Sequence, residues 1–109
     1  MQRVAQIIGL RSAEIERYVE LHQAVWPDVL ATIAACHIKN YSIFLRRPEN
    51  LLFAYFEYHG TDYAADLEQM AADAKTQQWW EITMPQQRPL DSVTDGQWWA
   101  PAEEVFHVD

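Results

Sequence analysis

The chain has 109 residues, 50% hydrophobic and 13% aromatic, with a formal net charge of −8. This length fits one domain, so we expect residues 1–109 to form a single domain around its own core. The negative charge repels polyanions, which argues against nucleic acid and anionic membrane surfaces as partners and leaves small neutral ligands.

Cysteine usage and the N-terminal residues indicate the compartment. Cys36 is the only cysteine, so no internal disulfide is possible, and a lone thiol suits a reducing environment. No apolar run approaches ~18 residues, and residues 1–10 lack the pattern of a secretory signal. We therefore expect a cytoplasmic protein.

The first half of the chain reads as a strand followed by two helices. Residues 4–10 are β-branched and short, which predicts the strand, and Ser12 is a reasonable N-cap for the first helix. An apolar stripe with helical spacing follows, made of Ile15, Tyr18, Val19, His22, Val25 and Trp26. Pro27 suits the first turn of a second helix, whose stripe comprises Val29, Leu30, Ile33 and His37.

The second half predicts a hairpin, further helices and a terminal strand. Residues 41–45 alternate in polarity and residues 51–58 are rich in aromatics, so the two form strands around a turn at 47–50. Asp62 can cap a helix that runs through Leu67, Met70 and Ala71, and another helical piece carries Trp79 and Trp80. Residues 86–101 read as irregular, and residues 104–108 as a last strand. The order β-α-β-β-α-β, with extra helices, predicts an α+β, ferredoxin-like sheet with helices on one face.

Tyr18 and His22 are the first candidates for chemistry. Four residues apart on a helix, their side chains are neighbours. One interpretation is a core histidine satisfied by the tyrosine hydroxyl. The other is an acid/base pair at a pocket wall, because histidine titrates near neutrality. The spacing alone leaves both open.

Ten Trp and Tyr rings exceed what a core of this size needs, so some are expected at a ligand or subunit interface. Trp79 and Trp80 are adjacent, and consecutive helical residues point about 100° apart. We expect one to pack inward and the other to line a cleft or an interface. For Trp98 and Trp99, packing against a core or subunit surface is the favoured interpretation. Glu57 shares a strand face with apolar residues, and its role is left open. The four histidines lack metal-ligand spacing, so no metal is expected.

The motif Tyr18-x-x-x-His22-x-x-x-Trp26-Pro27 resembles the L-rhamnose mutarotase family. Further resembling segments follow in the family's order: Asn40-Tyr41-S-I-F-Leu45, Asn50-L-L-F-Ala54, Gln78-Trp79-Trp80 and Glu104-Val105-Phe106. Together these segments span nearly the whole chain, and the resemblance is weaker over residues 63–74 and 88–102.

The resemblance implies that His22 is the proton donor and that Tyr18, Tyr41, Trp79 and Trp80 bind the sugar. It implies a homodimeric α+β barrel, with C-terminal strands that cross between subunits, and an isomerase that interconverts the α and β anomers of L-rhamnose without a cofactor. It assigns no role to Glu81. Two alternatives stay open: a cofactor-free monooxygenase-type or haem-handling protein on the same barrel, and a non-catalytic sugar-binding module.

Overall fold

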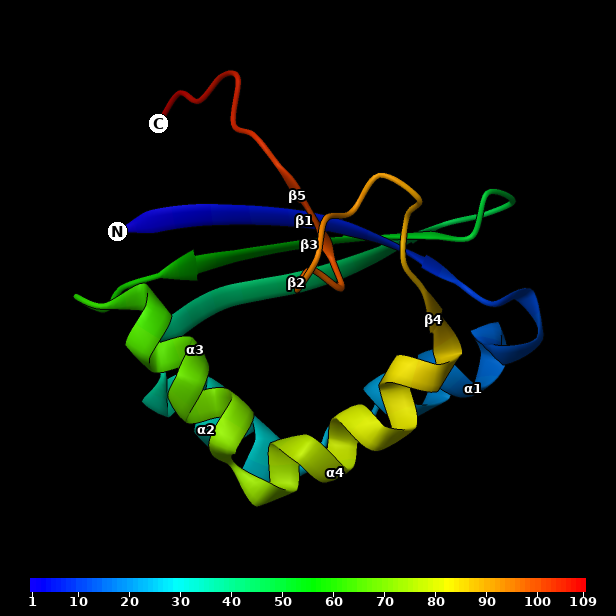
Figure 1. The fold of residues 1–109 in the computed structure, drawn as a ribbon, viewed down its shortest axis with the longest axis horizontal. Coiled ribbons are helices and arrows are strands. Elements are labelled where there is room, and N and C mark those ends of the chain that lie inside the picture. The colour runs from blue at the N-terminus through cyan, green and yellow to red at the C-terminus, as the bar shows by residue number, and fades with distance from the viewer.

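The computed structural model describes residues 1–109. A curved antiparallel sheet is covered on one face by helices (Figure 1). The strands are β1 (Gln2–Leu10), β2 (Ile38–Arg46), β3 (Leu51–Tyr58), β4 (Gln87–Arg88) and β5 (Ala100–Ala102). The helices are α1 (Ile15–His22), α2 (Pro27–Ala35), α3 (Tyr63–Ala72) and α4 (Ala74–Thr83), with the 3₁₀ turns η1 (Ser12–Glu14) and η2 (Met84–Gln86). None of these helices is long and apolar enough to cross a bilayer.

The order of the strands confirms the predicted ferredoxin-like α+β fold. The path through the sheet is β2-β3-β1-β4, so the first strand and the second strand of the hairpin lie at its centre. β4 pairs with the end of β1, and β5 pairs with its middle at residues 5–7. The helices follow on the same side of the sheet, which leaves its other face without a helical cover (Figure 1).

Strict alternation along β3 separates the two faces of the sheet. Leu52, Ala54, Phe56 and Tyr58 are buried beneath the helices, and the residues between them point the other way. One core cluster joins the sheet to α1 and consists of Ile8, Leu10, Ile15, Tyr18 and Leu52. Another, at the opposite end of the sheet, consists of Ile38, Phe56 and Tyr58. The aromatic residues of β3 are therefore divided between the faces, with Phe56 and Tyr58 in the core and Phe53 and Tyr55 on the other side.

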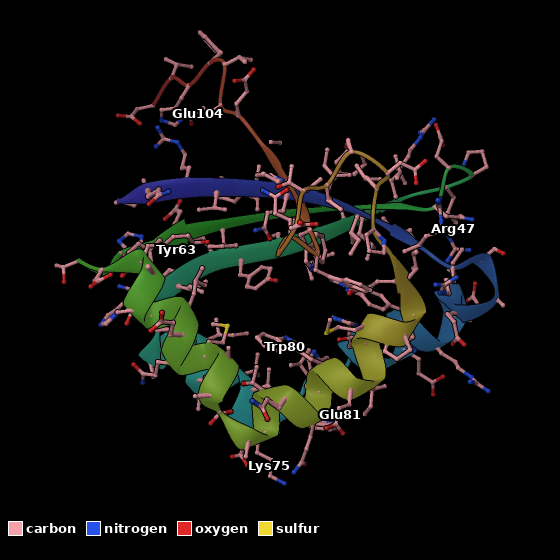
Figure 2. The ribbon with its side chains drawn as sticks, viewed as in Figure 1. Arg47, Tyr63, Lys75, Trp80, Glu81 and Glu104 are labelled. Carbon is pink, nitrogen blue, oxygen red and sulfur yellow. The ribbon has the colours of Figure 1, made fainter.

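The face without helices is apolar at its centre. Phe44 on β2 lies opposite Phe53 on β3, and the two are 62% and 38% exposed. The chain beyond β5 leaves the sheet on this same side (Figure 1). Its anchor is Glu104, labelled in Figure 2, whose carboxylate accepts hydrogen bonds from the Arg3 guanidinium. A monomer thus leaves aromatic surface in water on this face.

Two local predictions, at Pro27 and Asp62, are confirmed, and a second cap of the same kind is found at Asp73. Pro27 opens α2 at its first turn. Asp62 caps α3 by accepting a hydrogen bond from the Ala65 amide at 3.1 Å. Asp73 caps α4 in the same way, through the Thr76 amide at 2.9 Å. In both, a carboxylate satisfies an amide that the first turn leaves unpaired.

Three helix limits differ from the predictions. Ser12 is not an N-cap, because it begins the 3₁₀ turn η1 and makes no side-chain cap bond. The first helix ends at His22, so Val25 and Trp26 lie in the connection to α2, where Pro27 forces a break. The second helix ends at Ala35, and His37 has a φ of 64°, which no helix can accommodate.

The predicted strand at residues 104–108 is absent. The strand near the C-terminus is β5, Ala100–Ala102, and the backbone of the residues after it pairs with no strand. Val105, Phe106 and Val108 are therefore among the most exposed apolar side chains in the chain. A strand requires a partner for its backbone groups, and a single subunit offers residues 104–108 none.

Candidate active site

His22 is the last residue of α1, and Tyr18 lies one turn before it. Their rings stack with centroids 4.1 Å apart and planes 27° from parallel. The His22 Nδ1 lies 2.8 Å from the carbonyl oxygen of Tyr18. Because a carbonyl can only accept, Nδ1 carries a hydrogen and donates it. The interpretation of a core histidine satisfied by the tyrosine hydroxyl was wrong in its partner, because the ring bonds to the backbone carbonyl of Tyr18. The acid/base interpretation stays a prediction.

This bond determines what the other ring nitrogen can do. Burial lowers the pKa of His22 below its usual value, and the bond to the Tyr18 carbonyl only partly offsets that effect. The imidazole is therefore neutral near pH 7, with its hydrogen on Nδ1 and a free lone pair on Nε2. Nε2 can accept a proton and, once protonated, can return it.

Trp79 supplies the next wall of the site. It lies on the buried face of α4 with Thr76 and Thr83, and only 6% of it is exposed. Its ring meets the His22 ring edge-on at 5.2 Å and the Trp26 ring edge-on at the same distance. Tyr18, His22 and Trp26 of the sequence motif are thus joined through Trp79 into one row of packed aromatic rings.

Trp80, the next residue in α4, lies outside this row of packed rings. It is half-buried and lines a hollow of about 400 Å³ together with Gln77, Glu81, Met84 and Pro85. In Figure 2 Trp80 is labelled on the side of α4 nearer the sheet, and Glu81 on the far side. The expected division between an inward ring and a cleft-lining ring is observed, with Trp79 inward and Trp80 in the hollow.

Tyr41 reaches the same side of the sheet from β2. Its ring packs on Phe56 with centroids 5.3 Å apart. Desolvation raises the pKa of its phenol, and the neighbouring phenols of Tyr18 and Tyr63 add to the shift. The residue as a whole is 40% exposed. The structure brings Tyr18, His22 and Trp79 into direct contact and places Tyr41 near Tyr18. Trp80 lines a hollow that includes none of the other four predicted site residues.

One polar residue at this site was not predicted. Gln87, the first residue of β4, is buried, and its Nε2 donates to the Tyr18 hydroxyl at 3.2 Å. Its Oε1 accepts from the Trp98 indole nitrogen at 2.7 Å. Gln87 is 69 residues from Tyr18 and lies in a stretch that reads as irregular, so no sequence spacing could have indicated it. Trp98 and Trp99 both pack against the core cluster around Tyr18, as the favoured interpretation expected.

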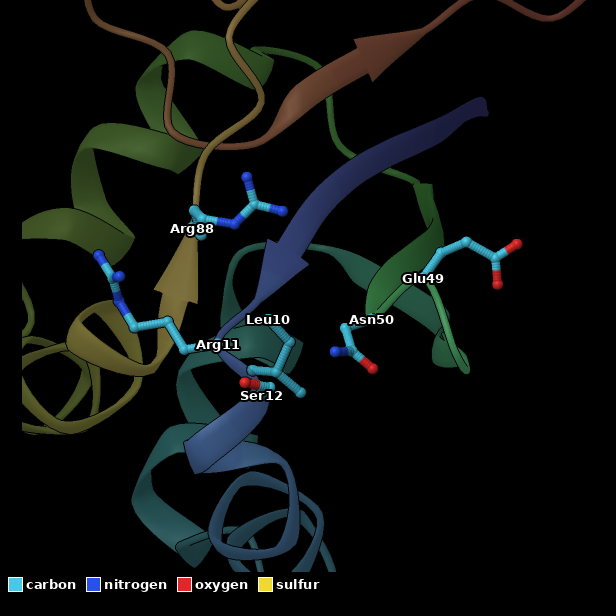
Figure 3. Close-up of a pocket in the computed structure, with 6 residues that line it drawn as sticks. All are labelled: Leu10, Arg11, Ser12, Glu49, Asn50 and Arg88. Carbon is cyan, nitrogen blue, oxygen red and sulfur yellow. The ribbon is translucent and has the colours of Figure 1, made fainter.

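Other polar groups lie elsewhere. Glu57, on the face without helices, accepts hydrogen bonds from Asn40 and Tyr55 and lies 3.0 Å from His59 Nε2, so its environment is polar. A separate hollow of about 300 Å³ is lined by Leu10, Arg11, Ser12, Glu49, Asn50 and Arg88. Its two guanidinium groups do not converge (Figure 3), and none of the five predicted site residues lines it. No group of three or more His, Cys, Asp or Glu side chains could hold a metal ion.

Comparison with known proteins identifies relatives of this chain. A protein named L-rhamnose mutarotase from Listeria monocytogenes serotype 4b is 35% identical over 85 residues, which cover 78% of this chain and 79% of that protein. One with the same name from Bacillus subtilis is 31% identical over the full length of both chains. The crystal structure of an L-rhamnose mutarotase from Formosa agariphila has the same fold, with a TM-score of 0.78, 23% identity and full coverage of both chains. The sequence model of L-rhamnose mutarotase matches residues 3–108. The chain therefore belongs to the L-rhamnose mutarotase family.

Proposed function

We propose that this protein is an isomerase that interconverts the α and β anomers of L-rhamnose. The observation that carries the proposal is the family match over residues 3–108, in a chain whose His22 has a free Nε2 beside Tyr18 and Trp79. The family match also favours this function over the monooxygenase and haem-handling alternatives on the same barrel.

The reaction needs one proton to move between two oxygens on the same carbon. We assign the acid/base role to His22, whose neutral Nε2 takes the proton of the anomeric hydroxyl as that oxygen forms a carbonyl. The bond between C1 and the ring oxygen breaks, and its electron pair goes to the ring oxygen, which receives the proton from His22. Rotation about the C1–C2 bond and the reverse steps close the ring on the other face. One positioned acid/base group contributes ~10²–10⁴-fold.

The remaining predicted residues are assigned to sugar binding. Tyr18 and Tyr41 offer hydroxyl groups to a polar ligand, and Trp80 offers an aromatic surface suited to a C–H face of a pyranose. Trp79, 6% exposed, can meet the sugar only at its edge, beside His22. A 6-deoxy sugar also carries a methyl group, whose burial contributes ~0.8 kcal/mol. An uncharged, aromatic site matches a neutral deoxysugar better than a phosphorylated one.

Anomer exchange measured by NMR saturation transfer tests the proposal directly. Catalytic amounts of protein should increase the rate of exchange between α- and β-L-rhamnose far above the uncatalysed rate. Binding of the sugar without any increase in exchange would instead establish a non-catalytic sugar-binding protein.

The proposal extends to a homodimer that works in the cytoplasm. Support for the dimer comes from the uncovered sheet face around Phe44 and Phe53 and from the unpaired apolar segment at residues 104–108. A second copy packed on this face would remove both from water, and the segment would gain a strand to pair with. Support for the cytoplasm comes from Cys36, a lone buried thiol that suits a reducing compartment.

A further inference from the structure

A buried hydrogen-bond chain joins Tyr18, Gln87 and Trp98, and the sugar-binding residues assigned above include only the first of them. Gln87 is held in place by its backbone, because β4 pairs with Leu10 at the end of β1. Trp98 is held by packing against the core cluster that contains Tyr18. Gln87 and Trp98 thus reach Tyr18 from a part of the chain distant from α1, and both are ordered by contacts independent of any ligand.

The donors and acceptors in this row of hydrogen bonds can be arranged in only one way. An indole nitrogen can donate a hydrogen bond but cannot accept one. The amide oxygen of Gln87 must therefore face Trp98, at 2.7 Å, and its amide nitrogen must face Tyr18, at 3.2 Å. The Tyr18 oxygen is then the acceptor, so its own hydrogen is not used by Gln87. No protein group accepts that hydrogen.

We propose that Gln87 and Trp98 are positioning residues, which keep the Tyr18 hydroxyl available as a hydrogen-bond donor to a sugar oxygen. The inference rests on the proposed function, because it presumes that Tyr18 meets the sugar. Beside Tyr18, the stacked His22 presents an acceptor at Nε2. The site then offers one donor and one acceptor from adjacent rings.

This arrangement suits the charge that develops during ring opening. As the bond to C1 breaks, the electron pair moves to the ring oxygen before the proton arrives. A donor already aimed at that oxygen stabilises it without reorientation. Removal of one such donor from an enzyme site typically lowers kcat by ~10²–10³-fold.

The substitution Gln87→Glu tests the proposal with almost no change in shape. The ionised carboxylate can still accept from Trp98, but it cannot donate to Tyr18, so the tyrosine hydroxyl turns to donate to it. We expect kcat for anomer exchange to fall ~10²-fold. Because a protonated carboxyl group can donate again, the deficit relative to wild type at each pH should shrink as the pH is lowered. In the Tyr18→Phe background, Gln87→Glu should have little further effect.

Matched controls separate hydrogen bonding from packing. Trp98→Phe removes the indole N–H that orients the amide and should lower kcat. Trp99→Phe changes a neighbouring ring on the same core, whose indole makes no bond to Gln87, and should leave kcat near wild type. Gln87→Met retains the volume but neither hydrogen bond, and should give a loss smaller than that of Gln87→Glu. If Gln87→Glu fails to fold, a comparison of kcat between Trp98→Phe and Trp99→Phe decides the same question.

A readout without turnover keeps this inference separate from the proposed function. The Gln87 hydrogen bond holds the pKa of the Tyr18 phenol lower than burial alone would. This pKa can be measured from the ¹³Cζ NMR signal of Tyr18 as a function of pH. Gln87→Glu should raise the pKa. Trp98→Phe should change it, and Trp99→Phe should not. If wild-type protein fails to accelerate anomer exchange, the proposed function is refuted. The titration of Tyr18 would still decide the hydrogen-bond arrangement. Acceleration by wild type with equal kcat for Gln87→Glu, or an equal loss in both Tyr18 backgrounds, would overturn the positioning role.

Discussion

Adjacent residues Trp79 and Trp80 should respond in opposite ways to alanine substitution. The Trp79 ring is nearly inaccessible and lies edge-on to both His22 and Trp26 at 5.2 Å. An indole buries ~200 Å², and ~25 cal/mol per Å² gives ~5 kcal/mol, of which the retained methyl group keeps a part. Trp79→Ala should therefore lower the free energy of unfolding by ~3–5 kcal/mol, the range of large-to-small core changes.

The same arithmetic gives a smaller loss for Trp80→Ala, because part of that ring faces the hollow. We expect ~1–2 kcal/mol, together with clearly weaker sugar binding. For a chain of this length, ~4 kcal/mol corresponds to a decrease in Tm of ~17 °C. Urea unfolding followed by circular dichroism, at one fixed subunit concentration, measures both variants. L-Rhamnose should also change the tryptophan fluorescence of wild type, and this change should diminish in Trp80→Ala. Equal destabilisation by the two substitutions would refute the assignment of Trp79 as the inward ring.

Three further predictions concern His22 and the uncovered face of the sheet. His22→Ala should stay folded by circular dichroism and lose most anomer exchange; activity within a few-fold of wild type would place the acid/base group elsewhere. Burial lowers the pKa of His22, and the neutral ring is the base, so kcat/KM should rise with pH through a value below 6.5 and then level off. A profile that falls as His22 loses its proton would contradict this. Sedimentation should show a dimer at micromolar concentration that Phe44→Asp dissociates, whereas a stable wild-type monomer would contradict the dimer.

The pH dependence of stability follows from the same shift. Because the pKa of His22 is lowered on folding, the unfolded chain binds more protons in the window between the lowered value and the usual one. The stabilisation is complete above the usual pKa and is lost as the pH falls through the folded value. His22→Ala should remove this part of the pH dependence.

Local sequence signals determined most of the secondary structure of this protein. The helical spacing of Tyr18 and His22, the alternation along β3, and Pro27 and Asp62 at helix starts depend on neighbouring residues alone. The ordered motifs in addition led to the family and to the candidate residues. The errors lie at element ends, as with Ser12 in a 3₁₀ turn, and at residues 104–108, where a strand was expected although one subunit offers no partner.

Only the tertiary structure decided how the residues of the candidate site are arranged. It chose Trp79 over Trp80 as the inward ring, because that choice depends on which face of α4 meets α1 and α2. It fixed the tautomer of His22 through a backbone carbonyl, and it brought Gln87 and Trp98 to the Tyr18 hydroxyl. Residues distant in the chain meet only when the sheet and its helices close around one core. The directions of their hydrogen bonds then follow from which groups can donate and which can only accept.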